Sequence, residues 1–454
     1  MTVSVCLFTA DLRLHDNPVL TAAVRAGDHV VPLFVLDEGV HAAGFDAPNR
    51  RAFLADCLAD LDAGLRERGG RLVVRAGKVV DEVCALVART GAQQVHLAAG
   101  SSAYAQRREA KLRTALGAVG CSLHVHDAVV TVVAPGAEVP QSSDHFAVFT
   151  PYFRRWQAHA MRNVAPAPRA VRVPEDVGSG PLPEPAKITG VSAGLARGGE
   201  RAGRSLLVDW LHKGLHQYAD QQSELAADGT SRLSGHVHFG SLSATELVHR
   251  AGAVGGPGAE AFIRQLAWRD FHHQVLAARP RAAVADYRTR HDHWRHDDEE
   301  AEAWRTGRTG YPVIDAAMRQ LRHEGWMPGR ARMLTASFLA KTLYLDWRIG
   351  ARHFLDLLVD GDVANNQLNW QWVAGTGTDT RPNRVLNPVT QAKRHDPQGD
   401  YVRQWVPELA GLEGAAVHEP WKLPGLERAR HDYPDPLVEL PDGLARFKQA
   451  RSLD

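Results

Sequence analysis

The sequence predicts an α/β protein in which an N-terminal domain with a doubly wound parallel sheet is followed by an all-helical domain. Residues 3–126 alternate short, β-branched apolar runs with helical patterns, which is typical of parallel sheets. From about Arg201 onward the apolar residues recur with the helical period of 3.6, and almost no strand pattern remains. The chain has 454 residues, which exceeds the usual size of a single hydrophobic core, so two domains are expected.

The first half of the chain is expected to supply the sheet. The strands are expected at 3–8, 30–36, 71–77, 94–99 and 122–126, and the helices between them at 53–68, 82–90 and 105–116. Sheets of this kind bind ligands beyond the carboxyl ends of their strands. Neither GxGxxG nor GxxxxGK[ST] follows any of these strands, so a dinucleotide site or a P-loop is not indicated.

A proline-rich stretch separates the two halves. Nine prolines and many glycines lie between Pro135 and Pro185, with few periodic segments, which indicates a long connector that runs over the surface. We therefore expect an α/β domain over residues 1–130, a linker over 131–200 and a helical domain over 201–454.

The second domain is expected to be helical throughout. Its apolar periodicity predicts helices at 201–218, 242–252, 259–278, 312–324, 330–345 and 350–358. Ten of the eleven tryptophans follow residue 200, which is more than core filling in two domains of similar size explains. Chemistry that uses aromatic side chains is therefore expected in this half.

The composition is that of an ordinary globular protein, with 44% hydrophobic and 23% charged residues. No apolar run approaches the roughly 20 residues that span a bilayer, and no secretory signal is evident, so a soluble, cytoplasmic protein without a membrane partner is expected. Four dispersed cysteines form no CxxC motif. Residues 319–352 hold seven Lys or Arg against two acids, and residues 381–403 hold five against two. Either stretch is a nucleic-acid contact or scattered solvated charge.

The hexapeptide 229–234 places three hydroxyls and a cation just after a glycine. Its candidate residues are Thr230, Ser231, Arg232, Leu233 and Ser234. Hydroxyls, free backbone N–H groups and a positive charge are what a pyrophosphate requires. The alternative is an ordinary Ser/Thr cap of the following helix.

Two helical segments each place their polar and aromatic side chains on two different faces, which would contact two different partners. In the first, Gln265 and Trp268 share one face, which suits hydrogen bonding to and stacking on a base, while Arg269 points elsewhere. A tryptophan that simply fills the core is the alternative. In the second, Arg330 and Met333 share a face, and the intervening arginine, at position 332, is turned toward another.

The segment DGDVANNQLNWQW begins with two carboxylates, Asp360 and Asp362. Asn366 and Trp370 follow at i and i+4 of a helix, and Trp372 projects to the opposite side, so the two indoles would serve two compartments. Paired carboxylates can also serve hydrolysis or a divalent metal, but no suitable His or third acid stands nearby.

One histidine cluster has the spacing of metal ligands. His291, His293 and His296 lie in a polar, acidic segment, where a solvated loop is the competing interpretation. We therefore predict no metal site.

Together these segments resemble the photolyase/cryptochrome flavoprotein family over almost the whole chain, and most closely its cyclobutane pyrimidine dimer photolyases. The motifs that carry the resemblance are LFTADLRLHDNPVL, DHFAVFTPYFRRW, GTSRLS, QLAWRDF, TGYPVIDAAMRQL, GWMPGRARM, DGDVANNQLNWQW, GTGTDTRPNRVLNP and HEPWK. Because they are ordered motifs with matching separations, the resemblance is specific.

The resemblance implies a bound FAD in the helical half. The residues it places around the cofactor are Tyr218, Thr230, Ser231, Arg232, Leu233, Ser234, Arg269, Arg332, Asp360, Gly361 and Asp362. Arg332 would pair with Asp360. Asn366 would face flavin N5, where an asparagine supports a fully reduced, anionic flavin. Trp294, Trp347 and Trp370 match the family's electron-transfer chain from the surface to the flavin.

The function that the resemblance implies is light-driven repair of DNA, in which reduced FAD gives an electron to a dimer flipped out of the duplex. The residues expected to hold DNA are Gln265, Trp268, Arg330, Met333, Trp372, Arg384 and Gln391. Three departures alter the expected lesion contacts. Gln265 replaces a common Glu, Pro328-Gly329 replaces His-Asn, and Gln222 stands where an arginine is frequent. The histidines that a (6-4) photolyase needs are missing.

A second pigment is implied in the first domain. Folate-using relatives have Asn-Glu where this chain has Arg107-Arg108, which favours 8-hydroxy-5-deazaflavin over methenyltetrahydrofolate. The main rival function is that of a cryptochrome, a blue-light photoreceptor that does not repair DNA. A flavin oxidoreductase that works in the dark would need a nicotinamide fingerprint, which is absent. A monomer that binds dimer-containing DNA is expected.

Overall fold

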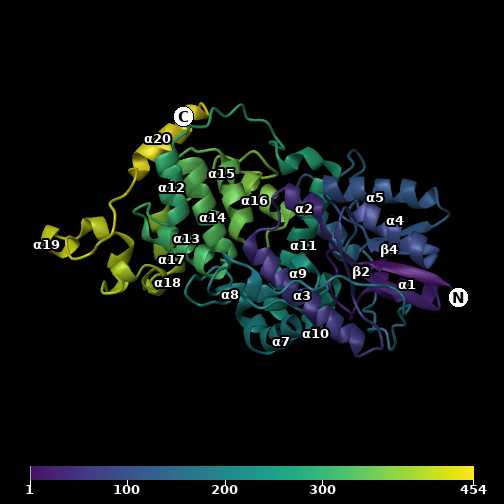
Figure 1. The fold of residues 1–454 in the computed structure, drawn as a ribbon. Coiled ribbons are helices and arrows are strands. Elements are labelled where there is room, and N and C mark those ends of the chain that lie inside the picture. The colour runs from purple at the N-terminus through teal and green to yellow at the C-terminus, as the bar shows by residue number, and fades with distance from the viewer. Residues whose placement is uncertain (1, 454) are drawn as a thin grey trace.

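The computed structural model describes residues 2–453 and contains a parallel sheet with helices on both faces, joined to a larger helical body (Figure 1). The strands are β1 (Val3–Leu7), β2 (His29–Asp37), β3 (Val73–Gly77), β4 (Gln94–Ala98) and β5 (Ser122–His126). They are all parallel in the order β3-β2-β1-β4-β5. The predicted fold class is therefore confirmed.

The connections of the sheet are helical. They comprise α1 (Pro18–Ala26), α2 (Glu38–Ala42), α3 (Pro48–Arg66), α4 (Val79–Thr90) and α5 (Ala103–Gly117). The strand order reverses between β1 and β4, which lie side by side in register with Val5 opposite Val95. The carboxyl ends of these two strands therefore mark the crevice in which a sheet of this type binds ligands.

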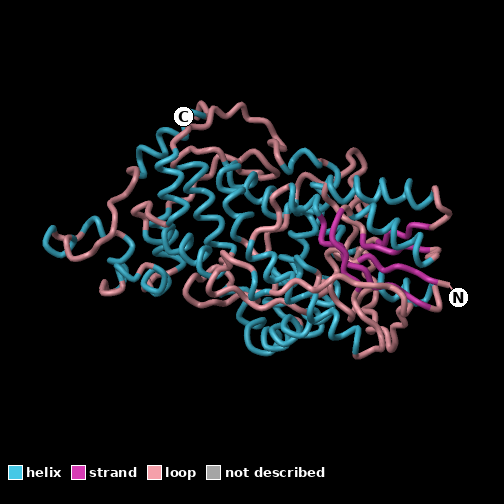
Figure 2. The backbone as a smooth tube through the Cα atoms, in the orientation of Figure 1, coloured by secondary structure: helices cyan, strands magenta, loops and turns pink. Residues whose placement is uncertain are grey.

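The rest of the chain is almost entirely helix and loop (Figure 2). Its α-helices are α6 (Phe149–Ala158), α7 (Glu200–Asp209), α8 (Tyr218–Gln221), α9 (Ser234–Phe239), α10 (Ala244–Val254), α11 (Gly256–Ala278), α12 (Asp298–Thr306), α13 (Pro312–Glu324), α14 (Gly329–Ser337), α15 (Trp347–Leu357), α16 (Val363–Ala374), α17 (Pro388–His395), α18 (Asp400–Trp405), α19 (Gly425–Arg428) and α20 (Leu440–Ala450). None of the helices in residues 2–453 is long and apolar enough to cross a bilayer.

Two helices expected from the sequence are shorter than predicted. The helix predicted over 201–218 ends at Asp209 and continues as a π-turn (Trp210–Gly214) and a short 3-10 turn. The helix predicted over 330–345 ends at Ser337 and passes into a second π-turn, Phe338–Thr342. A π-turn changes the backbone hydrogen bonding to i→i+5 over only five residues here, which is too short a stretch for the apolar periodicity of the sequence to reveal.

The segment between the two halves is not wholly a surface connector, as the sequence had suggested. It contains α6, whose side chains Tyr152 and Trp156 are buried against α11. The Trp156 indole N–H donates to Asp270, at 2.9 Å. Pro151 does not indicate a loop here, because it lies in the first turn of α6, where proline is tolerated.

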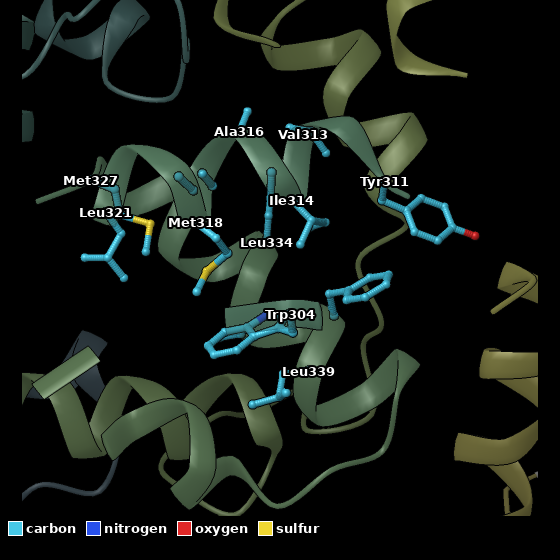
Figure 3. Packing of buried hydrophobic residues seen from close by; sticks show 14 of the residues in the cluster. Trp304, Tyr311, Val313, Ile314, Ala316, Met318, Leu321, Met327, Leu334 and Leu339 are labelled. Carbon is cyan, nitrogen blue, oxygen red and sulfur yellow. The ribbon is translucent and has the colours of Figure 1, made fainter. Parts of the chain in front are cut away.

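The main helical core is formed by α12 to α18 and the π-turn after α14 (Figure 3). Trp304 stands at its centre, fully buried, near Met318 and Leu339. The helical body also packs directly on the sheet domain. Gly240, at the end of α9, lies so close to Ala10 that a Cβ atom there would be 1.9 Å from the Ala10 carbonyl oxygen.

Candidate functional site

An ion pair between a buried carboxylate and a partly exposed guanidinium lies where the loop between α15 and α16 meets α14. Arg332 holds both carboxylate oxygens of Asp360, with N–O distances of 3.1 and 2.8 Å, and its Nε donates to the carbonyl of Met327. Burial alone would raise the pKa of Asp360, but the charge and hydrogen bonds of Arg332 outweigh it and lower the pKa. A carboxylate and a guanidinium are thus fixed side by side, in the pairing that the resemblance implied.

Asp362 occupies the N-cap of α16 and accepts from the backbone N–H of Asn365 at 2.7 Å. Burial alone would raise the pKa of its carboxyl, but His273, Arg269, His238 and the Asn365 amide together hold it well below its usual range. Burial lowers the pKa of His273 to about 4, so this imidazole is neutral near pH 7. Arg269 is therefore the permanent positive charge beside Asp362.

The hydroxyl-rich turn 229–234 leads into α9. The hydroxyl oxygen of Thr230 is buried and has no partner among the described residues. Ser234 accepts from the indole N–H of Trp326 at 3.1 Å. Leu233, not a hydroxyl residue, stands at the N-cap, and no side chain caps the helix. The ordinary Ser/Thr cap considered from the sequence is therefore not what this turn forms.

Arg232 differs from its expected role as a phosphate ligand. Its backbone has a φ of 52°, and its guanidinium lies 4.4 Å above the ring of Trp326. Asp228, at 2.7 Å, and Glu324, at 3.2 Å, both accept from it. Two carboxylates already neutralise this cation. Asp228 directly precedes the hexapeptide, whereas Glu324 comes from the distant helix α13, so the sequence neighbours could not reveal the second partner.

The remaining candidates around this site are buried or close-packed. Tyr218 lies on α8 against the rings of Trp210 and Phe262, and burial raises its pKa to about 12. Gly361 separates the two aspartates, and a Cβ atom there would be 2.7 Å from Nη1 of Arg50. Arg50 belongs to α3, so the sheet domain packs against the loop that carries both carboxylates.

These residues fit a flavin dinucleotide. An unpartnered hydroxyl at Thr230, two fixed carboxylates and the cations Arg332 and Arg269 supply the donors and acceptors that a pyrophosphate, ribose and flavin ring require. The buried Nδ1 of His238 likewise has no partner among the described residues. Orphaned buried polar atoms of this kind indicate a site that is completed by a ligand.

Asn366 and Trp370 lie one turn apart on α16, and both are buried. The Asn366 amide donates to the carbonyl of Ala351, at 2.9 Å, in α15. A Cβ atom at Gly350 would lie 2.1 Å from the Trp370 ring, so only glycine permits this contact between α15 and α16. The Trp370 indole is therefore held rigidly.

The other two tryptophans of the expected electron chain differ in burial. Trp347 is fully buried, and its indole N–H donates to Asp286, at 2.9 Å. Trp294 is only half-buried, with the Tyr344 ring at 4.9 Å. The gradation from buried to half-buried suits a conduit toward solvent. A fourth indole, Trp304, meets the Trp370 ring edge-on at 6.0 Å and was missed by sequence reasoning.

A second group of candidates gathers around α11 and α14. Trp268 differs from expectation, because its ring stacks on Phe149 of α6 at 3.7 Å, which leaves at most one face for a base. Gln265, one turn away and exposed, lies 3.4 Å from the Gln222 side chain. Arg330 donates to Ser223, at 3.1 Å.

Positive charge accumulates beside this group. Burial, followed by the charges of Arg384 and Arg394, lowers the pKa of Arg330. Trp372 lines a cavity of about 240 Å³ together with Arg384 and Arg381. Met333 packs on the neighbouring helical core, and Gln391, on α17, is half-buried. Basic residues of the two segments identified in the sequence, 319–352 and 381–403, thus lie close together.

Residues 4–173 match the family model described as DNA photolyase, and residues 262–452 match the FAD binding domain of DNA photolyase. The chain is 67% identical over 455 residues to the deoxyribodipyrimidine photo-lyase of Streptomyces griseus, with all of both chains covered. It belongs to the photolyase/cryptochrome family. Within this family, a class III photolyase from Agrobacterium tumefaciens has 30% identity and a TM-score of 0.93, covering 99% and 97% of the two chains. A Synechocystis cryptochrome has 28% identity and a TM-score of 0.91, covering 99% of each.

In this member of the photolyase/cryptochrome family, the histidines 291, 293 and 296 are not assembled into a metal site. Among residues 2–453, no group of three His, Cys, Asp or Glu side chains is arranged to hold a metal ion. His296 instead lies 3.6 Å from Asp298 on the surface. The side chains of all three histidines are exposed.

Proposed function

We propose that this protein is a deoxyribodipyrimidine photo-lyase that uses light to split cyclobutane pyrimidine dimers in DNA. The observation that carries the proposal is the 67% identity, over the full length, to a relative of that name. The bound FAD would supply the electron that, after light absorption, splits the dimer. The protein's own contribution is to hold the cofactor, to position a flipped-out dimer and to exclude water.

We propose that the cofactor is held in its reduced, anionic form by the helical domain, within the boundaries 1–130, 131–200 and 201–454 suggested by the sequence. Thr230, Ser231, Leu233 and Ser234 would bind the phosphates and ribityl chain beside Tyr218, and Asp362 with Arg269 would bind elsewhere on the dinucleotide. The two hydrogen bonds from Arg332 fix Asp360, and with it the backbone of the adjacent Gly361, which would contact the flavin. Asn366 would lie at flavin N5.

Trp370, Trp347 and Trp294 would restore the reduced cofactor by carrying electrons inward from the surface. Trp370 and Trp347 are both buried and Trp294 is half-buried, which supports a path that reaches the surface at Trp294. The lesion would lie between the second group of residues and the flavin. Gln265, the free face of Trp268, Met333 and Trp372 would line its pocket. Arg330, Arg384 and Gln391 would hold the DNA backbone.

An antenna pigment in the crevice beyond β1 and β4 is a further part of the proposal, with 8-hydroxy-5-deazaflavin preferred to methenyltetrahydrofolate. Tyr104 donates to Asp37 at the carboxyl end of β2, and Arg108 lies nearby on α5 with its Nε buried and without a partner among the described residues. A half-buried arginine with a buried, unpartnered Nε favours a pigment with an acidic hydroxyl. The absorption spectrum of the purified pigment, visible for the deazaflavin and near-ultraviolet for the folate, distinguishes the two.

We also propose a monomer that works in the cytoplasm. Its four cysteines are all free, as expected in a reducing compartment. Light scattering of the purified protein measures the oligomeric state.

The deciding experiment illuminates the purified, reduced protein with an oligonucleotide that contains one thymine dimer. We expect the ultraviolet absorbance of the separated bases to recover in the light and not in the dark. A protein that holds reduced flavin and binds this DNA but restores no absorbance would instead be a cryptochrome, the alternative left open by the similarity to the Synechocystis protein.

A further inference from the structure

Lys341 is a lysine enclosed by protein. It lies in the π-turn after α14, its side chain is only 2% exposed, and no Asp or Glu among residues 2–453 forms an ion pair with it. Burial, followed by the nearby charge of Arg451, lowers its pKa to about 7. A buried, unpaired cation costs folding free energy, so it needs an explanation other than stability.

The ammonium of Lys341 is bound to one loop. It donates to the carbonyl oxygens of Pro382, at 2.8 Å, and Arg384, at 2.7 Å. Both belong to residues 380–385, here called the arginine loop, which joins α16 to α17. In this loop Arg381 and Asn383 are exposed, as is the side chain of Arg384.

Two arginines hold the segment that leads into the arginine loop, also through its backbone carbonyls. Arg451 donates to the carbonyl of Ala374 at 2.9 Å, and Arg290 donates to that of Gly375 at 3.2 Å. Of these four contacts, the two made by Lys341 lie nearest to the C-terminal end of the segment between α16 and α17. They fix the arginine loop itself, which carries the exposed arginines.

The orientation of these carbonyls determines what the loop presents outward. In a trans peptide the C=O and N–H groups point in opposite directions. Because the carbonyls of Pro382 and Arg384 point inward to Lys341, the N–H groups of Asn383 and Val385 point away from it. Neither N–H has a partner among residues 2–453. The loop therefore combines two amide donors that point away from Lys341 with two exposed arginine side chains, a combination that suits a phosphate backbone.

We propose that Lys341 is a positioning residue that holds the arginine loop in the shape that binds the phosphate backbone of dimer-containing DNA. This inference rests on the proposed function. Lys341 does not touch DNA itself; it acts through Arg381, Arg384 and the two outward amides. The nearby Arg330, whose pKa is affected by Arg384, extends the same basic surface.

The test replaces Lys341 with methionine, which has similar length but no donor. For the flavin-loaded K341M protein we expect about tenfold weaker binding to a duplex with one thymine dimer, equivalent to about 1.4 kcal/mol, and a shallower dependence of affinity on salt. Flavin content and light-driven flavin reduction should stay as in the wild type. Lys187→Met, the same change at an exposed site in the connector, should bind DNA normally.

A double-mutant cycle separates positioning from general support of the fold. If Lys341 acts through the loop, Lys341→Met should weaken binding far less in an Arg384→Ala background than alone. Equal losses in both backgrounds, unchanged binding by K341M, or a loss that tracks its unfolding midpoint would each overturn the inference. Failure of the wild-type protein to bind the same duplex would instead overturn the proposed function, and this inference with it.

Discussion

The Asp360–Arg332 pair is the residue-level feature with the clearest energetic consequence. Asp360→Asn removes the charge but keeps the shape, so Arg332 loses a two-point ionic partner. Because Arg332 is about one-quarter exposed, we expect a loss of about 1–2 kcal/mol in the free energy of unfolding and a lower ratio of bound flavin to protein. Denaturant titration and flavin absorbance measure the two effects.

The control for this prediction is Asp356→Asn. Asp356 pairs with Arg352 at 2.9 Å on the surface of α15, with both side chains about half exposed. An exposed pair contributes about 0–1 kcal/mol, so this variant should keep its flavin and nearly all its stability. If both variants behaved alike, the buried pair would have no special role.

Electron transfer through the tryptophans makes a separate prediction. Trp294→Phe removes the half-buried outer member of the chain, so light-driven reduction of the oxidised flavin should slow at least tenfold, while repair by chemically reduced protein stays nearly intact. Flash photolysis and the repair assay measure the two rates. Trp421→Phe changes an indole that packs on Tyr311 instead, and should alter neither. Equal loss of both activities in the Trp294 variant would exclude the proposed chain.

At this scale the sequence predicted pairs that lie close along one helix or one motif better than contacts between distant segments. Spacing on one helix placed Asn366 and Trp370 together. It could not show that Phe149 covers one face of Trp268, or that Lys341 is buried, because both depend on segments brought together by folding.

At the scale of elements, α16 is fixed by its cap. Asp362 accepts from the Asn365 N–H at 2.7 Å, and Asp362→Ala should cost about 1 kcal/mol or more in unfolding free energy and should also lower flavin retention. Ser102→Ala removes the corresponding cap of α5, where Ser102 accepts from Ala105. That control should lose similar stability with its flavin retained. Equal flavin loss in both variants would place Asp362 outside the cofactor site.

The sequence predicted all five strands of the sheet domain and its helices α3, α4 and α5, but not α1 or α2, and it predicted several long helices of the second domain. It missed α6, where aromatic packing on α11 outweighs an unfavourable local composition. It also missed both π-turns, because each changes the hydrogen bonding over only five residues, too few for the apolar periodicity to reveal. Irregular backbone of this kind is fixed by tertiary contacts.

At the scale of the whole molecule, buried neutral histidines predict sensitivity to acid. Burial lowers to about 4 the pKa values of His236, His238, His272, His273 and His353. The unfolded chain binds protons near pH 6.5, so it holds more protons than the folded chain between pH 6.5 and 4. Stability is therefore complete above pH 6.5 and falls as the pH drops, by up to about 2 kcal/mol at pH 5 for each histidine. Urea midpoints at pH 7 and 5 test this, and equal midpoints would contradict it.

The contact between the two halves of the molecule makes the last prediction. Gly240 has a φ of 67°, a Cβ there would be 1.9 Å from the backbone oxygen of Ala10, and its own carbonyl accepts from the buried Arg13 at 2.9 Å. Gly240→Ala should therefore force the helical body away from the sheet and cost about 3 kcal/mol.

Gly91, at the end of α4, is the matched control, because its φ of 64° is nearly the same but its surroundings are open. Gly91→Ala should cost only about 1 kcal/mol, the strain of the left-handed backbone alone. Thermal unfolding and limited proteolysis compare the variants, and we expect early cleavage of the 131–200 segment only in Gly240→Ala. Equal losses would mean that the contact with Ala10 yields without cost, and that the two halves are coupled through Arg13 and Arg50 instead.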